Sequence, residues 1–114
     1  MRTLDQLDLS DNDLTAVRQA ASILRERFPV TSVVLFGSKA RGQATSESDI
    51  DLLVLTHEQV NHEQKRRMSR ALFDLQLQRA VVINLLIVPA EDWERGLYQV
   101  LPIRREIEKE GVPA

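Results

Sequence analysis

Two neighbouring stretches carry most of the information in this sequence: FGSKARG at residues 36–42 and SDIDLLV at residues 48–54. In the second stretch, Asp49 and Asp51 flank an apolar residue, as in a strand, so both carboxylates are expected to project from one face of a sheet. Two carboxylates held this close repel each other, and an oxygen-rich site suits Mg²⁺ completed by substrate phosphates and water. Taken alone, the pair would favour a solvated strand end with two ordinary surface acids.

The first stretch supplies groups that bind phosphate. Gly37 permits close approach of the backbone, and exposed N–H groups with the Ser38 hydroxyl can hold phosphate oxygens. Lys39 and Arg41 follow, and they offer a triphosphate a point charge and bidentate hydrogen bonds. A solvated turn is the alternative interpretation of these two cations. Phosphate donors that end one strand, beside carboxylates that open the next, favour a joint nucleotide and metal site.

The rest of the chain is predicted to alternate helices and strands. The predicted elements are a helix capped by Ser10 and ended by Pro29, strands over 31–36, 49–55 and 80–88, a helix from a capping box at Asn61 to about Arg79, a helix opened by Pro89 with Trp93, Leu97 and Leu101 as its apolar stripe, and a last helix that ends at Gly111 in a left-handed cap. This order predicts an α+β fold, a small mixed sheet of α/β type with flanking helices, in a single domain over residues 1–114.

Composition excludes several classes of protein. The 114 residues are 43% hydrophobic and 28% charged, as in globular domains, and the absence of cysteine excludes disulfides and thiolate metal sites. A net charge of −2 argues against binding nucleic acid by bulk charge. No apolar run reaches the length of a membrane span. We therefore expect a cytoplasmic protein without membrane contacts, and composition leaves open a homo- or hetero-oligomer.

The two stretches at residues 36–42 and 48–54 resemble the nucleotidyltransferase signature of the DNA polymerase β superfamily. The Gly-Ser pair, the ten-residue gap and the Asp-x-Asp motif are similar in particular to the minimal nucleotidyltransferases, called MNT. The resemblance implies a polymerase β-like nucleotidyltransferase fold that binds ATP and Mg²⁺, with two ions expected. Many MNT proteins are antitoxins that neutralise a HEPN-domain ribonuclease toxin by transferring AMP to one of its tyrosines.

In such a transfer an acceptor hydroxyl attacks the α-phosphorus and pyrophosphate leaves, so catalysis consists mostly of positioning and charge neutralisation. The resemblance assigns roles to residues at both stretches. They are Asp49 and Asp51 as catalytic and metal-binding residues, and Gly37, Ser38, Lys39 and Arg41 as nucleotide-binding residues.

One position departs from the superfamily pattern, which usually has a third carboxylate on a later strand. The equivalent position here is Asn84, whose carbonyl can bind a metal but whose amide cannot accept a proton. A strand residue with a satisfied amide is an equally weighted alternative. Glu91 or Asp92 could replace the missing acid, although a place in the first turn of a helix explains both.

The loss of that acid favours a tyrosine acceptor, because a phenol with a pKa of about 10 depends less on a protein base than an aliphatic hydroxyl does. Our first hypothesis is therefore an Mg²⁺-dependent antitoxin that adenylylates a HEPN toxin. The alternatives are nucleotidyl transfer to a small molecule or RNA, and a non-catalytic MNT module that neutralises its partner by binding. Asp51→Ala separates the enzyme from the binder, because only the enzyme would lose neutralisation.

Overall fold

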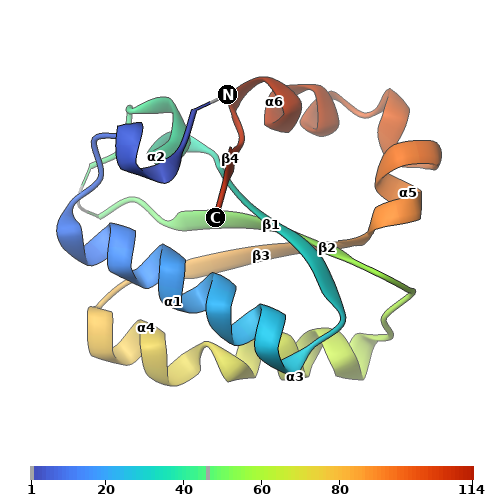
Figure 1. Cartoon of the computed structure of the whole chain (residues 1–114), viewed down its shortest axis with the longest axis horizontal. Coiled ribbons are helices and arrows are strands. Elements are labelled where there is room, and N and C mark those ends of the chain that lie inside the picture. Colours follow the sequence, from blue (N-terminus) through green and yellow to red (C-terminus); the bar gives the residue numbers. More distant parts are fainter. Residues whose placement is uncertain (1, 46) are drawn as a thin grey trace.

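A four-stranded mixed sheet forms the centre of the protein in the computed structural model, which describes residues 2–45 and 47–114 (Figure 1). The helices are α1 (Asp11–Arg27), α2 (Ser38–Arg41), α3 (His62–Ala71), α4 (Phe73–Arg79), α5 (Ala90–Arg95) and α6 (Pro102–Glu110), with 3₁₀ turns η1 (Leu4–Gln6) and η2 (Leu97–Val100), and the strands are β1 (Val30–Phe36), β2 (Ile50–Thr56), β3 (Ile83–Pro89) and β4 (Val112–Pro113). In the strand order β3-β2-β1-β4, β1 is antiparallel to both neighbours and β2 is parallel to β3. The predicted α+β class with flanking helices is confirmed.

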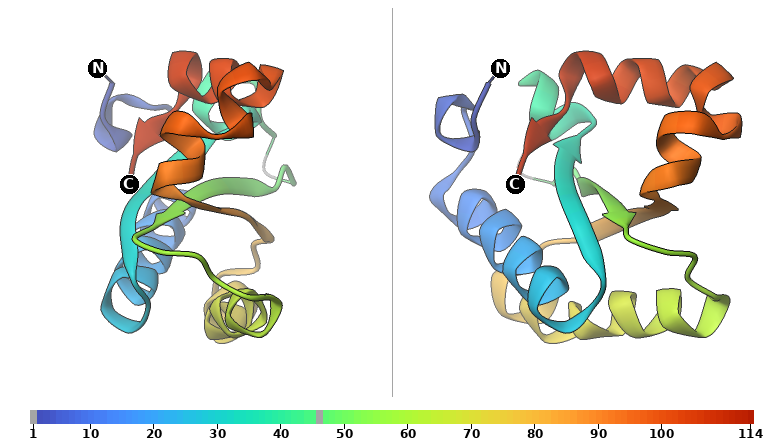
Figure 2. Two further views of the ribbon diagram at one scale, coloured as in Figure 1. Left: turned by 90° about the vertical axis from the view of Figure 1, so that its right-hand side faces the viewer. Right: turned by 45° about the vertical axis from the view of Figure 1, so that its right-hand side comes forward.

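Helices cover the two faces of the sheet in separate layers, with α1, α3 and α4 on one side and α5 and α6 on the other (Figure 2). Side chains alternate between these layers along each strand, because neighbouring residues of a strand point to opposite faces. Leu35, Leu52 and Ile83 pack with α1, α3 and α4, whereas Leu53 and Val88 pack with Trp93 of α5 and Ile107 of α6. A polar site on this sheet is therefore expected at a strand end that one of the two helix layers does not cover.

Two predicted helix starts are confirmed. The Ser10 hydroxyl accepts a hydrogen bond from Asp13 N at 3.0 Å and caps α1. Asn61 and Gln64 exchange hydrogen bonds of 2.8 and 2.9 Å and form the predicted capping box of α3. Side chains of this kind satisfy N–H groups that the first turn of a helix leaves without partners.

The single helix expected up to Arg79 is two helices in the structure, α3 and α4, with Leu72 between them. Leu72 N donates to Ser69 O, so one tight turn interrupts the α-helical ladder while Leu72 itself stays buried. The strand expected from residue 80 begins only at Ile83. Ala80 has a φ of 55° and ends α4 in the left-handed conformation, which a non-glycine side chain adopts rarely.

The helix predicted after Pro89 is also shorter than expected. It ends at Arg95 because Gly96 is extended, and Leu97, expected in its apolar stripe, is 72% exposed. The left-handed cap predicted at Gly111 is wrong, because this residue is extended. Glycine is needed there for space, since a Cβ would lie 2.7 Å from Val34 Cγ1.

Three short elements carry no clear signal in the sequence: η1, α2 and β4. The last of these pairs Val112 with Leu35 and so closes the edge of the sheet beside β1. In the described part of the chain, no helix combines the length and the apolar character needed to cross a bilayer.

Candidate active site

Asp49 and Asp51 lie where β2 begins, on the face of the sheet that carries α5 and α6. Ile50, between them, is fully buried on the opposite face, in the cluster that packs against α1. Asp49 is exposed and Asp51 is half-buried. The alternation predicted from the sequence therefore projects both carboxylates to one side of the strand, at a place that solvent reaches.

Asn84 joins these two carboxylates. The parallel register of β2 and β3 sets Asn84 directly beside Asp51. Its amide nitrogen donates to Asp49 Oδ2 at 3.0 Å and to Asp51 Oδ1 at 3.1 Å. A neutral donor thus lies between two like charges and offsets part of their repulsion. The structure brings the three side chains together as one cluster.

Gly37 forms the wall of this cluster on the side of β1. The antiparallel register pairs Phe36 with Asp51, so the turn after β1 begins next to that carboxylate. Gly37 has a φ of 77° and a ψ of −159°, a conformation essentially restricted to glycine. A Cβ at this position would lie under 3.0 Å from Asp51 Oδ2, closer than real Cβ atoms approach. Ser38 follows as the first residue of α2, so the Gly-Ser pair is adjacent to the carboxylates.

Lys39 lies elsewhere than the nucleotide-binding role predicts. Its side chain is 4% exposed, and its ammonium group is 2.6 Å from Asp13 Oδ2 in α1. It also donates to Thr45 O at 3.2 Å. In this arrangement the ammonium group is directed toward α1 and Thr45. The role of Lys39 in binding nucleotide stays a prediction, and it would require the ammonium group to leave Asp13.

Arg41 also has a partner other than the carboxylate cluster. Its guanidinium contacts Glu110 Oε2 at 3.1 Å and Gln43 Oε1 at 3.2 Å. The pair of Arg41 and Glu110 is partly exposed, so water replaces its contacts more easily than it replaces those of a buried pair. The role of Arg41 in binding nucleotide stays a prediction, and it would require the guanidinium to leave Glu110.

The acids considered as substitutes for the missing third carboxylate are remote from the cluster. Glu91 and Asp92 belong to α5, which begins after the far end of β3, whereas Asn84 lies near the start of that strand. Asp92 accepts a hydrogen bond from Gln59 instead. Within residues 2–45 and 47–114, no group of three acidic, histidine or cysteine side chains forms a candidate metal site.

The donor set nevertheless fits a hard cation. It consists of two carboxylates and an amide whose carbonyl oxygen could turn toward a metal, and oxygen ligands of this kind suit Mg²⁺. Mg²⁺ commonly binds one or two carboxylates and completes its coordination with water and substrate phosphates. Gly37 leaves the approach to Asp51 free of a side chain. Asp49, Asp51 and Asn84 are therefore the residues that would hold the metal.

Comparison with known proteins agrees with this geometry. A family model described as the nucleotidyltransferase domain matches residues 17–113, which include the whole cluster. The chain belongs to this nucleotidyltransferase family. A solved minimal nucleotidyltransferase shares 30% identity with a TM-score of 0.61, over 94% of this chain and 99% of the other. The nucleotidyltransferase fold predicted from the two stretches is thus confirmed over nearly the full length described.

Two further proteins resemble this nucleotidyltransferase. A relative from Haemophilus influenzae named "Probable protein adenylyltransferase MntA" is 28% identical over 109 residues, which cover 96% of this chain and 93% of the relative. The structure of a tri-AMPylated Shewanella oneidensis HEPN toxin in complex with an MNT antitoxin matches with a TM-score of 0.55 at 16% identity, over 87% of this chain and 68% of the other. At that identity the second match shows the fold alone.

The two groups that bind the Lys39 ammonium could not be predicted from patterns in the sequence. They are the Asp13 carboxylate and the Thr45 carbonyl. Asp13, in the first turn of α1, binds Lys39 from 26 positions upstream. Thr45 contributes a backbone carbonyl, which every residue carries. Such contacts depend on how α1 packs against α2 and cannot be inferred from spacing along the chain.

Proposed function

We propose that this nucleotidyltransferase is a Mg²⁺-dependent protein adenylyltransferase that transfers AMP from ATP to a tyrosine of a HEPN-type ribonuclease toxin and thereby acts as its antitoxin. The observation that carries the proposal is the cluster of Asp49, Asp51 and Asn84 against Gly37. Support for the acceptor comes from the similarity to the Haemophilus relative and to the MNT antitoxin found with an AMPylated HEPN toxin.

The chemistry is a balanced group transfer. The phenol oxygen of the acceptor attacks the α-phosphorus of ATP, the bond from that phosphorus to the bridging oxygen of the β-phosphate breaks, and pyrophosphate leaves with the electron pair. The phenol proton passes to solvent. Mg²⁺, when bound, neutralises phosphate charge and aligns the phosphates. Asp49 and Asp51 would hold that ion beside the reacting phosphate, and Gly37 with Ser38 offers backbone and hydroxyl donors to the departing phosphates.

The presence of Asn84 in place of a third carboxylate favours a phenol over an aliphatic hydroxyl as the acceptor. The Asn84 amide donates to both carboxylates and cannot accept a proton. A phenol, with an unperturbed pKa of about 10, needs less help from a base than a ribose hydroxyl does. A partner protein that carries this tyrosine would also supply the acceptor site itself.

Label transfer tests the proposal. Purified chain is incubated with α-phosphate-labelled ATP and Mg²⁺ in lysate of the source cells, with a chelator control. A labelled protein band that requires both the chain and Mg²⁺ is expected, and mass spectrometry should place AMP on a tyrosine. Label on RNA or on small molecules would contradict the tyrosine acceptor. A co-purifying partner without any label would indicate a module that neutralises by binding.

Asn84→Asp tests whether this cluster binds the metal. Without divalent ions, a third negative charge replaces a donor to two carboxylates, so we expect the free energy of unfolding to fall by about 1 kcal/mol. With millimolar Mg²⁺, the melting temperature should rise more in this variant than in the native chain, as measured by thermal unfolding. Gln19→Glu on α1 adds the same charge away from the cluster and is the control. If Mg²⁺ raised the melting temperature of Asn84→Asp and of the native chain equally, the result would contradict the assignment of this cluster as the metal site.

A further inference from the structure

The buried ion pair of Lys39 and Asp13 has no role in the chemistry described above. We propose that this pair positions two parts of the active site relative to each other, because the Lys39 side chain connects them. The two parts are the Gly37–Ser38 turn and the loop that leads into Asp49. The effect of the pair on transfer rests on the proposed function, whereas its effect on the loop does not. Lys39 and Asp13 are positioning residues in this proposal, since neither touches the carboxylate cluster.

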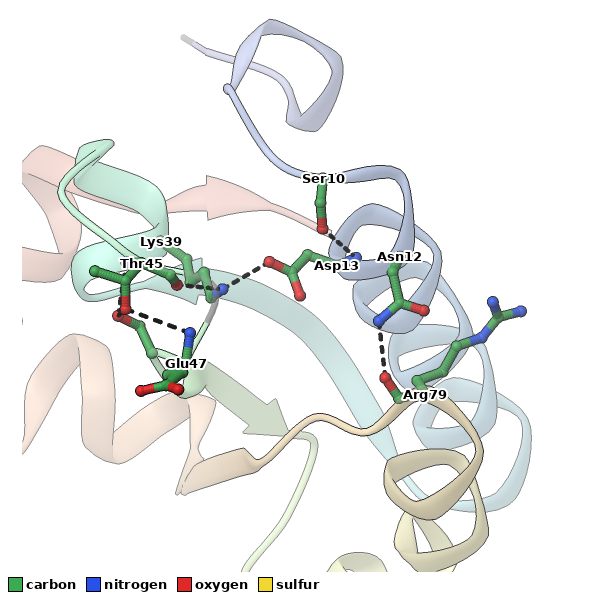
Figure 3. Close-up of polar contacts among 8 residues, drawn as sticks. Ser10, Asn12, Asp13, Lys39, Thr45, Glu47 and Arg79 are labelled. Carbon is green, nitrogen blue, oxygen red and sulfur yellow. Dashed lines mark hydrogen bonds and ion pairs between the residues drawn. The ribbon is translucent and has the colours of Figure 1, made fainter.

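The pair is enclosed and short. The side chains of Lys39 and Asp13 are 4% and 12% exposed, and Nζ lies 2.6 Å from Oδ2 (Figure 3). Charges removed from water in this way keep a fixed geometry, because few other partners are within reach. An exposed pair of the same length, Arg18 with Asp5, is 52% and 71% exposed and has no such constraint.

Asp13 is itself held in place by its neighbours in the first turn of α1. Its backbone N–H donates to the Ser10 hydroxyl, which caps the helix. The adjacent Asn12 donates to Arg79 O at 2.8 Å, at the end of α4 (Figure 3). Arg79 precedes β3, the strand that carries Asn84. The carboxylate that binds Lys39 is thus fixed relative to the strand that completes the cluster.

Lys39 transmits this position to the loop before Asp49. Its ammonium donates to Thr45 O, and the same carbonyl accepts the Ser48 N–H at 3.1 Å. Thr45 N in turn donates to the Ser48 hydroxyl at 3.0 Å. Ser48 is the residue before Asp49. One ammonium group therefore links α1, the turn that begins α2 and the residue that precedes a site carboxylate.

Stability alone does not explain the pair. Replacing a buried ion pair by apolar side chains of similar volume is often neutral or stabilising, because the cost of desolvating two charges disappears. Apolar side chains cannot donate a hydrogen bond to Thr45 O, so the loop would lose its link to residue 39. A role in binding phosphate makes the opposite prediction for Asp13, since its loss would release Lys39 toward the nucleotide.

The test compares the native chain with a double variant, Asp13→Leu with Lys39→Met, which leaves no unpaired buried charge. Amide exchange of Ser48, followed by NMR, should accelerate at least about 10-fold, while exchange in the centre of β2 stays unchanged. The melting temperature should not fall. Initial rates of AMP transfer at saturating ATP should drop at least about 10-fold, with the ATP concentration for half-maximal rate nearly constant. Asp5→Leu with Arg18→Met is the matched control and should behave as the native chain.

Three outcomes would overturn the inference. Unchanged Ser48 exchange in the double variant would show that the pair does not hold the loop, whether or not the chain transfers AMP. Native transfer rates despite faster exchange would show that the loop position is irrelevant to the site. Tighter ATP binding in Asp13→Asn alone would assign Lys39 to the nucleotide. Absence of label with the native chain contradicts the proposed function instead, and the exchange measurement then decides the inference.

Discussion

Asp51→Asn is expected to lower AMP transfer on the order of 10³-fold, the scale on which phosphoryl transfer depends on a principal charge-stabilising group. Asp51 is the central member of the cluster, because its register neighbours are Phe36 on one side and Asn84 on the other. Asparagine keeps a carbonyl oxygen that Asn84 Nδ2 can bind, so the hydrogen bond persists while the negative charge is lost. The rate is measured by label transfer at saturating ATP and Mg²⁺.

The same substitution should leave stability intact or raise it. Two like charges on one face of a strand repel each other, and removing one is expected to increase the free energy of unfolding by up to about 1 kcal/mol in the absence of metal. The stabilisation by Mg²⁺ should disappear, as measured by thermal unfolding. Asp74→Asn, an exposed aspartate of α4, is the control for the loss of one charge.

A fall in both activity and stability would indicate a structural role for Asp51 and contradict this assignment. Continued neutralisation of a toxin partner by a variant that no longer transfers AMP would favour the non-catalytic binding module. The Asp51→Asn variant thus distinguishes the enzyme from the non-catalytic binding module. The enzyme should lose neutralisation of its partner with this substitution, whereas the binding module should keep it.

The carboxylate cluster could be predicted from the sequence because strand periodicity is a strong local rule. Alternation of Asp49, Ile50 and Asp51 was sufficient to place both acids on one face, and Ile50 is indeed buried on the other. Asn84 was the only polar residue of the later strand, and the parallel register brings it to Asp51. Strand alternation therefore predicted the two carboxylates, whereas the resemblance to the superfamily, which usually has a third carboxylate on a later strand, implied that Asn84 lies beside them.

The cations around the cluster could not be predicted in the same way. Lys39 and Arg41 follow Gly37-Ser38 closely in the chain, and proximity in sequence suggested proximity to phosphate. A side chain as long as lysine reaches groups on several sides of a turn, so its partner depends on tertiary packing. Here the packing of α1 beside α2 presents Asp13, and the free charge expected at the site is neutralised.

The elements of the fold followed the sequence where caps and periodicity agree, as at Ser10 and Asn61. The observed elements differ from the predicted ones where the local sequence does not determine the backbone conformation. Ala80 adopts a left-handed conformation without being glycine, and Leu72 interrupts a helix without proline or glycine nearby. Residues of β4 form a strand only because β1 offers an open edge. The pairing of β4 with β1 is a tertiary contact that outweighs a local preference.

Gly37→Ala is expected to reduce AMP transfer at least 100-fold and to destabilise the fold. A methyl group at this position would meet Asp51 Oδ2 at under 3.0 Å, so the carboxylate or the turn must move. A displacement of about 1 Å in a group that positions a reacting phosphate is enough to cost 10²-fold. The backbone adds a second cost, because a φ of 77° with a ψ of −159° is unfavourable for alanine by about 1–3 kcal/mol.

Gly42→Ala separates the two costs, because Gly42 also has a positive φ, 74°, but no atom lies within 4 Å of the position its Cβ would take. It should lose about 1 kcal/mol of stability for its left-handed backbone and keep nearly native transfer, measured at a temperature where both variants are folded. Equal losses of transfer in the two variants would show that backbone strain in the turn, rather than contact with Asp51, controls the site. A selective loss in Gly37→Ala would establish that the bare backbone at residue 37 is what leaves Asp51 free to hold the metal and the nucleotide.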